Sequence, residues 1–171
     1  MMKLQFSILN PIYQSDPLLC ANANATILSA LSSLTNTRTS DNRKPLLITV
    51  STTGIPSPGS PNDVPWLLLP LYKWLLHGPH HDKSTMEANI RAQLTQPDSE
   101  RAISGFVTVK PTLLMDGRGK GVEKVNAGVE KRPAFGYMIQ RADVGRWMFQ
   151  SLVENGVKEE WMNKSVSLAY L

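Results

Sequence analysis

The chain has 171 residues, of which 42% are apolar and 19% charged, and its formal net charge is +4. This length and composition fit one globular domain, residues 1–171, with a full hydrophobic core. The Lys and Arg residues are scattered and form no basic stripe with aromatic residues interleaved, which argues against a nucleic-acid-binding protein.

Cysteine content and hydropathy indicate the compartment. Cys20 is the only cysteine, so no disulfide can form within the chain, as is usual in a reducing compartment. Met1–Leu9 has too short an apolar run for a signal peptide, and the longest apolar stretch, Val64–Leu76, is interrupted by two prolines and a lysine. We therefore expect a cytoplasmic protein that does not enter a membrane.

The first predicted elements are a strand and a helix. Polar and apolar residues alternate over Lys3–Leu9, which predicts a strand. Asp16-Pro17 predicts a helix start, because the carboxylate accepts hydrogen bonds from the first helical N–H groups and proline has no N–H to leave unsatisfied. Apolar residues at spacings of three and four predict the buried face of this helix: Cys20, Ala23, Ile27, Leu31 and Leu34.

The middle of the chain predicts a buried strand and two helices. Leu46–Val50 is a continuous apolar run, typical of a strand covered on both faces, and Ser51–Gly54 follows it directly. A Pro/Gly/Ser-rich loop over Ile55–Asn62 comes next. Helices are expected over Trp66–His77 and Lys83–Leu94, the second with Met86, Ile90 and Leu94 on one face.

The last third predicts strands around one further helix. Phe106–Val109 reads as a strand ended by Lys110-Pro111, and a glycine-rich loop spans Asp116–Gly121. A short strand over Tyr137–Ile139 precedes a helix over Arg141–Asn155, which buries Val144, Met148 and Leu152 and stops at Gly156. Val166, Leu168 and Tyr170 alternate in a final strand.

Strands separated by helices predict right-handed βαβ units and a parallel sheet. Such sheets bind ligands beyond the carboxyl ends of their strands, which here are Ser51–Gly54 and Pro111–Leu114.

A series of short motifs resembles a known family. It consists of Ser51–Gly54, the pair Lys83 and Glu87, Lys110–Leu114 and Arg141–Gly145. In order and spacing it resembles the atypical short-chain dehydrogenases, specifically the NmrA-like, NAD(P)-binding proteins of filamentous fungi. The resemblance implies an α/β fold with a Rossmann-like, doubly wound parallel sheet.

One departure from the family concerns the phosphate-binding turn. Family members begin with a strand and a Gly-x-x-Gly-x-x-Gly turn for the cofactor pyrophosphate, and nothing before Asp16 resembles it. We therefore expect a partial sheet that lacks its first βαβ unit. The cluster Gly117–Gly121 has the wrong spacing for a dinucleotide turn or a P-loop, and we expect a flexible loop there.

The resemblance also implies a site for NAD or NADP. Lys83 would hold the cofactor ribose and lower the pKa of a Tyr four residues earlier, but that position is Pro79. The usual acid–base residue is therefore missing, with Tyr72 and Tyr137 as candidate substitutes. The implied catalytic residues are Lys83, Thr52 and Thr53. The implied cofactor-binding residues are Ser51, Thr52, Lys83, Pro111, Thr112, Leu113 and Leu114.

Other polar residues have simpler interpretations. His77, His80, His81 and Asp82 lack a distant partner set and do not predict a metal site. Asp143 with Arg141 reads as a charge pair at a helix start. Cys20 reads as a small core residue, and the four tryptophans, at 66, 74, 147 and 161, read as packing residues of the core and the domain edge.

Three functions remain open from the sequence. The first is an NAD(P)H-dependent oxidoreductase acting on a small organic substrate. The second is a non-catalytic dinucleotide-binding or sensor protein, which the proline at position 79 favours. The third is an inactive fragment that is poorly stable alone or self-associates through an unpaired sheet edge. The substrate and the choice between NAD and NADP stay open.

Overall fold

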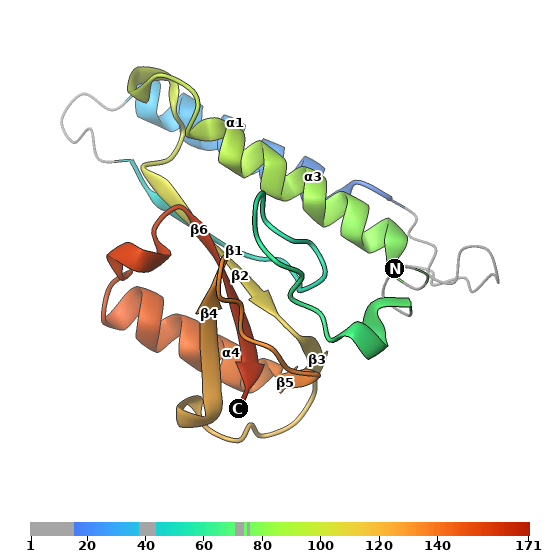
Figure 1. Ribbon diagram of the computed structural model, residues 1–171. Helices are drawn as coiled ribbons and strands as arrows, with labels where there is room; N and C mark the ends of the chain where they lie inside the picture. Colours follow the sequence, from blue (N-terminus) through green and yellow to red (C-terminus); the bar gives the residue numbers. More distant parts are fainter. Residues whose placement is uncertain (1–15, 38–43, 71–73, 75) are drawn as a thin grey trace. The chain divides into compact units, whose positions relative to one another are not determined.

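A computed structural model describes residues 16–37, 44–70, 74 and 76–171 (Figure 1). The predicted strand Lys3–Leu9, Tyr72 and part of the predicted helix 66–77 lie outside these residues. The chain divides into two compact units: unit 1 is Met1–Leu47 with Pro70–Phe106, and unit 2 is Ile48–Leu69 with Val107–Leu171.

Unit 1 is built on two helices, α1 (Leu19–Thr37) and α3 (His77–Gln93). α1 starts three residues after the predicted Asp16, whose Oδ1 accepts a hydrogen bond from the Leu18 N–H at 3.1 Å in the turn before the helix. The apolar core of the unit joins both helices to the segment before the second strand, and consists of Leu28, Met86, Ile90, Ala102, Ile103 and Phe106.

The structure corrects the buried face of α1. The predicted residues Cys20 and Leu31 pack against the core, but the most buried residues are Ala21, Asn24 and Leu28, and the predicted Ala23, Ile27 and Leu34 are exposed. Small and apolar residues surround most of this helix, so a spacing of three and four fits more than one face. The predicted face of α3 is confirmed, since Met86 and Ile90 are buried and Leu94 packs against the same core.

The start of α3 also differs from the prediction. The helix begins at His77 instead of Lys83, with Pro79 in its first turn. N–H groups in the first turn have no helical acceptor, so proline is tolerated there. The predicted helix before it opens with a 3₁₀ turn over Trp66–Leu68, and Leu69, Pro70 and Trp74 are α-helical in the part that is described.

Unit 2 contains most of a four-stranded sheet with the order β1-β2-β6-β4. Its strands are β1 (Leu46–Val50), β2 (Gly105–Pro111), β6 (Lys164–Tyr170) and β4 (Val125–Val129). β6 runs parallel to β2 and antiparallel to β4. A second, smaller sheet pairs β3 (Leu113–Met115) with β5 (Met138–Gln140) in parallel.

Hydrogen bonds at the end of β1 fix its direction. The Ser51 N–H donates to the Val109 carbonyl at 2.8 Å, and the Thr53 N–H donates to the Pro111 carbonyl at 3.2 Å. Both residue numbers rise by two, as they do only between parallel strands. The predicted parallel arrangement of these two segments is therefore confirmed.

One helix covers one face of this sheet in unit 2 (Figure 1). α4 (Arg141–Met148) continues as a π-helix over Phe149–Glu154, and Gly156 follows it with a φ of 74°. Val144 and Leu152 of this segment are buried and Met148 is partly buried, as predicted. The core beneath it consists of Val107, Val109, Ile139, Val144, Trp147, Leu152, Trp161, Val166 and Leu168.

The predicted final strand is confirmed as β6, which buries Ser165 and Ser167 as well as Val166 and Leu168. Other predictions about the sheet and the tryptophans need correction. β1 is an edge strand of the described sheet and is only partly buried, with Val50 exposed. β4 was not predicted at all. Of the tryptophans, Trp147 and Trp161 are buried with ring centroids 5.2 Å apart, whereas Trp66 and Trp74 are exposed.

Among the described residues, no helix is long and apolar enough to cross a membrane.

Candidate functional site

The register of the strands places polar side chains together on one face of the sheet in unit 2. In a parallel pair, the N–H of a residue bonds the carbonyl that precedes its opposite neighbour, so Ser51 lies opposite Lys110 and Thr53 opposite Thr112. By the same register Thr49 lies opposite Thr108, and their hydroxyl oxygens are 3.5 Å apart.

The next strand continues these rows. Thr108 pairs with Ser165 and Lys110 pairs with Ser167. The face opposite α4, here called the hydroxyl face, therefore consists of Thr49, Ser51, Thr53, Thr108, Lys110, Thr112, Ser165 and Ser167.

The hydroxyl face ends at the carboxyl ends of β1 and β2. Ser51, Thr53 and Thr112 are 2%, 1% and 3% exposed. The Thr112 N–H donates to the Leu168 carbonyl at 3.0 Å, but Thr112 Oγ1 has no hydrogen-bond partner among the described residues. A buried hydroxyl left unpaired costs about 1–3 kcal/mol. Such a group at a strand end is a candidate position for a ligand or a water molecule.

The structure brings together most of the predicted site residues. Ser51, Thr53, Pro111 and Thr112 meet at the strand ends of unit 2, with Thr52 partly exposed between its neighbours. Leu113 and Leu114 follow in β3, where Leu113 is half exposed and Leu114 packs against the α4 core. Lys83 lies on α3 in unit 1.

Of the two candidate substitutes for the tyrosine missing at position 79, Tyr72 lies outside the described residues and Tyr137 is 56% exposed next to β5. Pro79 lies in the first turn of α3. Burial, together with the positive charges of Lys83 and His77, lowers the pKa of the neighbouring His80. No cluster of His, Cys, Asp or Glu able to hold a metal ion occurs in the described ranges of the chain.

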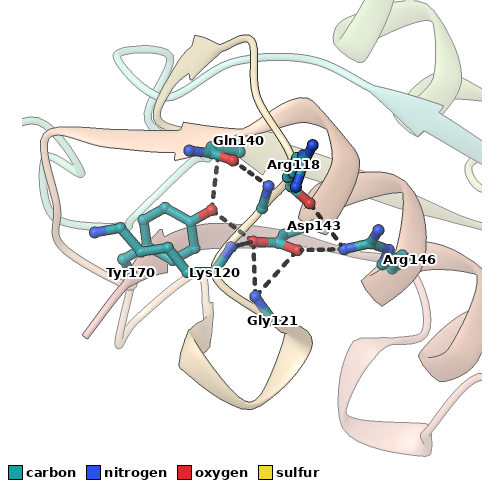
Figure 2. Close-up of polar contacts among 8 residues, drawn as sticks. Arg118, Lys120, Gly121, Gln140, Asp143, Arg146 and Tyr170 are labelled. Carbon is teal, nitrogen blue, oxygen red and sulfur yellow. Dashed lines mark hydrogen bonds and ion pairs between the residues drawn. The ribbon is translucent and has the colours of Figure 1, made fainter.

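A second polar cluster in unit 2 centres on Asp143 of α4 (Figure 2). This carboxylate is fully buried. It accepts hydrogen bonds from the Lys120 N–H at 2.5 Å, the Tyr170 hydroxyl at 2.6 Å and the Gly121 N–H at 3.2 Å. Arg146 lies 3.3 Å from it.

Asp143 lies in the first turn of α4 as predicted, but its interpretation as a charge pair with Arg141 is wrong. Arg141 instead pairs with Asp116 at 2.5 Å. The glycine-rich loop is tied to α4 by its own backbone, through Lys120 and Gly121 to Asp143 and through Gly119 to Gln140. Gly119 has a φ of 91°, and a Cβ there would collide with the Asp143 carboxylate. Glycines at alternate positions were the available signal for this close approach.

The contacts of this second cluster shift the pKa values of Asp143 and Tyr170. Burial raises the pKa of Asp143, but the hydrogen bonds from Tyr170, Lys120 and Gly121 and the charge of Arg146 outweigh burial and hold that pKa below its usual value. Burial and the hydrogen bond to Asp143 raise the pKa of Tyr170. Tyr170 is therefore further from titrating near neutral pH than a free tyrosine, and it does not fit the role of the missing acid–base residue.

Comparisons with named proteins identify two fungal relatives. The chain is 40% identical over 158 residues to a protein named reductase pytE from Aspergillus terreus, covering 91% of this chain and 59% of the relative. It is 34% identical over 164 residues to oxidase pynE from Aspergillus niger, covering 89% of this chain and 57% of the relative. The chain thus spans somewhat more than half the length of these relatives. No protein-family model matches it.

Solved structures establish the fold. A short-chain dehydrogenase/reductase from Veillonella parvula superposes with a TM-score of 0.60 at 16% identity, over 96% of this chain and 60% of that chain. Another from the same organism, solved in complex with NADP, gives 0.59 at 13% identity, over 91% of this chain and 68% of that one. The predicted α/β, Rossmann-like fold is confirmed for the part that the chain spans.

Proposed function

We propose that this chain forms the nicotinamide side of an NAD(P)-dependent oxidoreductase of the short-chain dehydrogenase type, NmrA-like, with a small organic substrate. The observation that carries the proposal is the pair of parallel strand ends at Thr53 and Thr112, where buried hydroxyls meet and Thr112 Oγ1 has no described partner. The names reductase and oxidase of the two Aspergillus relatives support it.

The residues at the strand ends fit the polar part of a nicotinamide. Thr112 offers a hydroxyl that both donates and accepts, as a carboxamide group requires. When bound, the cofactor supplies or accepts a hydride. In this proposal Pro111–Leu114 border the nicotinamide, Ser51 and Thr52 bind the cofactor, Thr52 and Thr53 hold the substrate oxygen, and Lys83 holds ribose hydroxyls. We also place the protein in the cytoplasm, as its single cysteine, Cys20, favours.

Replacement of Thr112 tests the proposal. NADPH and NADH are titrated by fluorescence into the wild type, Thr112→Val and Thr112→Ser. We expect Thr112→Val to raise the Kd by about fivefold to tenfold, the size of one lost hydrogen bond, and Thr112→Ser to retain binding. Valine replaces an unpaired buried hydroxyl by a methyl group, so the melting temperature is expected not to fall, which separates lost binding from unfolding.

Thr95→Val is the matched control, because Thr95 is an exposed threonine that follows α3. It is expected to leave both Kd values unchanged. Absence of NADPH and NADH binding by the wild type at millimolar nucleotide removes the proposal.

A second candidate function is dinucleotide binding without catalysis. Pro79 favours it, because the position four residues before Lys83 has no proton to transfer. This function predicts NADPH binding without NADPH oxidation in the presence of a panel of quinones and ketones. Turnover with any of them excludes it.

A further inference from the structure

Lys110 is a buried cation at the centre of the hydroxyl face. It is 2% exposed, opposite Ser51 on one side and Ser167 on the other. An ammonium group removed from water costs several kcal/mol unless it is paired and hydrogen-bonded. The ammonium group of a lysine in this position therefore needs hydrogen-bond acceptors or carboxylates around it, and its bonds restrain those groups.

The contacts of Lys110 lead to the segment that follows the strand end. Its Nζ donates a hydrogen bond to the Ile55 carbonyl at 2.5 Å. It also lines a small hollow together with Asp63, Ser57, Ser165 and Ser167. Residues 54–63 are here called the strand-end loop. Lys110 thus bonds this loop one residue after its start.

Asp63 closes the strand-end loop from its other end. It is 5% exposed, and its Oδ1 accepts the Gly54 N–H at 2.7 Å. Burial raises the pKa of Asp63, whereas the Gly54 N–H and the charge of Lys110 act in the opposite direction. The cation and the carboxylate therefore fix the two residues that come directly after Thr53.

The consequence concerns the strand-end hydroxyls. Ser51 and Thr53 stand at the last two backbone hydrogen bonds between β1 and β2, and beyond them only the strand-end loop continues the chain. We propose that Lys110 is a positioning residue: by holding the strand-end loop on the hydroxyl face it fixes Ser51–Thr53 opposite Thr112 for the dinucleotide. This inference rests on the proposed function of the strand ends.

The test compares Lys110→Met with Lys110→Arg and with Lys124→Met. Lys124 is exposed between the glycine-rich loop and β4, so its loss controls for a removed lysine charge. Hydrogen–deuterium exchange of a peptide covering the strand-end loop reports whether the loop is held. The Kd for NADPH, and KM against kcat for any substrate turned over, report the effect on the site.

We expect Lys110→Met to speed exchange in the strand-end loop by about tenfold and to raise the NADPH Kd by about tenfold, with kcat less affected than KM. Lys110→Arg keeps a buried cationic donor and is expected to lie within about threefold of the wild type. Lys124→Met is expected to match the wild type in both readouts.

The outcomes separate the two proposals. If the wild type binds neither NADPH nor NADH, the proposed function fails and the positioning role with it. If the wild type binds but Lys110→Met exchanges and binds like Lys124→Met, the positioning role alone is overturned. Faster loop exchange with an unchanged Kd also overturns it, because Lys110 then acts only on the loop.

Should Lys110→Met not fold, Asp63→Asn decides by the same two measurements, since it removes the charge but keeps an oxygen for Gly54.

Discussion

Asp143 is a carboxylate with no exposed surface, and the Tyr170 hydroxyl, two backbone N–H groups and Arg146 stabilise its charge. Because its folded pKa lies below the usual value near 4, its stabilising effect is fully present above that value. The effect is lost as the pH falls through the folded pKa. Asp143 therefore contributes to acid sensitivity of the fold.

We predict that Asp143→Asn lowers the free energy of unfolding by about 2–3 kcal/mol at neutral pH, because it removes a buried hydrogen-bonded charge. The difference from the wild type is expected to shrink as the pH falls below about 4. Urea unfolding at a series of pH values measures it. Asp116→Asn is the control, since Asp116 is 90% exposed at the start of the glycine-rich loop that contacts Asp143. Its effect on the free energy of unfolding is expected to stay within about 0.5 kcal/mol. A pH-independent difference for Asp143→Asn would contradict the ionised state.

For single residues, the sequence predicted the place of a residue in its strand or turn better than its hydrogen-bond partners. Ser51, Thr53 and Thr112 were placed correctly at strand ends, because strand and turn signals are local. The partners of Asp143 and Lys110 were not predicted. Lys120, Tyr170 and Ile55 lie 23 to 55 residues from them in sequence, and no local pattern reports such contacts.

The start of α1 shows how one element depends on another. The Asp82 carboxylate on α3 accepts hydrogen bonds from the N–H groups of Cys20 and Ala21, both at 2.9 Å. It satisfies two of the N–H groups that every helix leaves unpaired at its start. A buried side chain of α3 thus caps α1, in addition to the exposed Asp16 that the sequence predicted.

We predict that Asp82→Ala lowers the free energy of unfolding by about 2–3 kcal/mol, because two N–H groups and the start of α1 lose their acceptor. Asp16→Ala removes one exposed hydrogen bond and is expected to cost about 0.5–1 kcal/mol. Urea unfolding followed by circular dichroism at 222 nm measures both. Equal effects of the two substitutions would show that Asp82 is not the main cap.

Element boundaries were predictable where the signal was strong and local. Arg141 as a helix start and Gly156 as the stop agree with the structure, whereas α3 begins six residues before the predicted Lys83. Gly78 and Pro79 indicated a break before the helix, because both residues disfavour a helix interior. The sequence alone does not show that they fall in the first turn, where proline is tolerated. β4 was missed because its five residues contain Asn126 and Gly128, which disfavour strands unless neighbours supply the pairing.

For the whole molecule, the open question is whether the two units unfold together. β1 belongs to unit 1 at Leu46 and Leu47 and to unit 2 from Ile48, and β2 crosses the boundary between Phe106 and Val107. A strand cannot lose half of its length without weakening the rest. This continuity supports the prediction of a single domain over residues 1–171.

We predict one cooperative transition in urea. Circular dichroism at 222 nm reports mainly the helices, and the fluorescence of the buried pair Trp147 and Trp161 reports unit 2. The two midpoints are expected to coincide, and Asp82→Ala in unit 1 is expected to shift both equally. Two separate midpoints would mean two domains. Trp66→Phe serves as a control that leaves the fluorescence midpoint unchanged, because Trp66 is 80% exposed.

The two unlike faces of β2 also govern how the chain avoids misfolding. If this strand paired one residue out of register, Val109 would face the serines of β6. The ammonium of Lys110 would then point into the apolar core around Trp147. An unpaired charge in that layer would cost several kcal/mol. Lys110, which holds the strand-end loop in the folded protein, therefore also disfavours this misaligned register while the sheet forms.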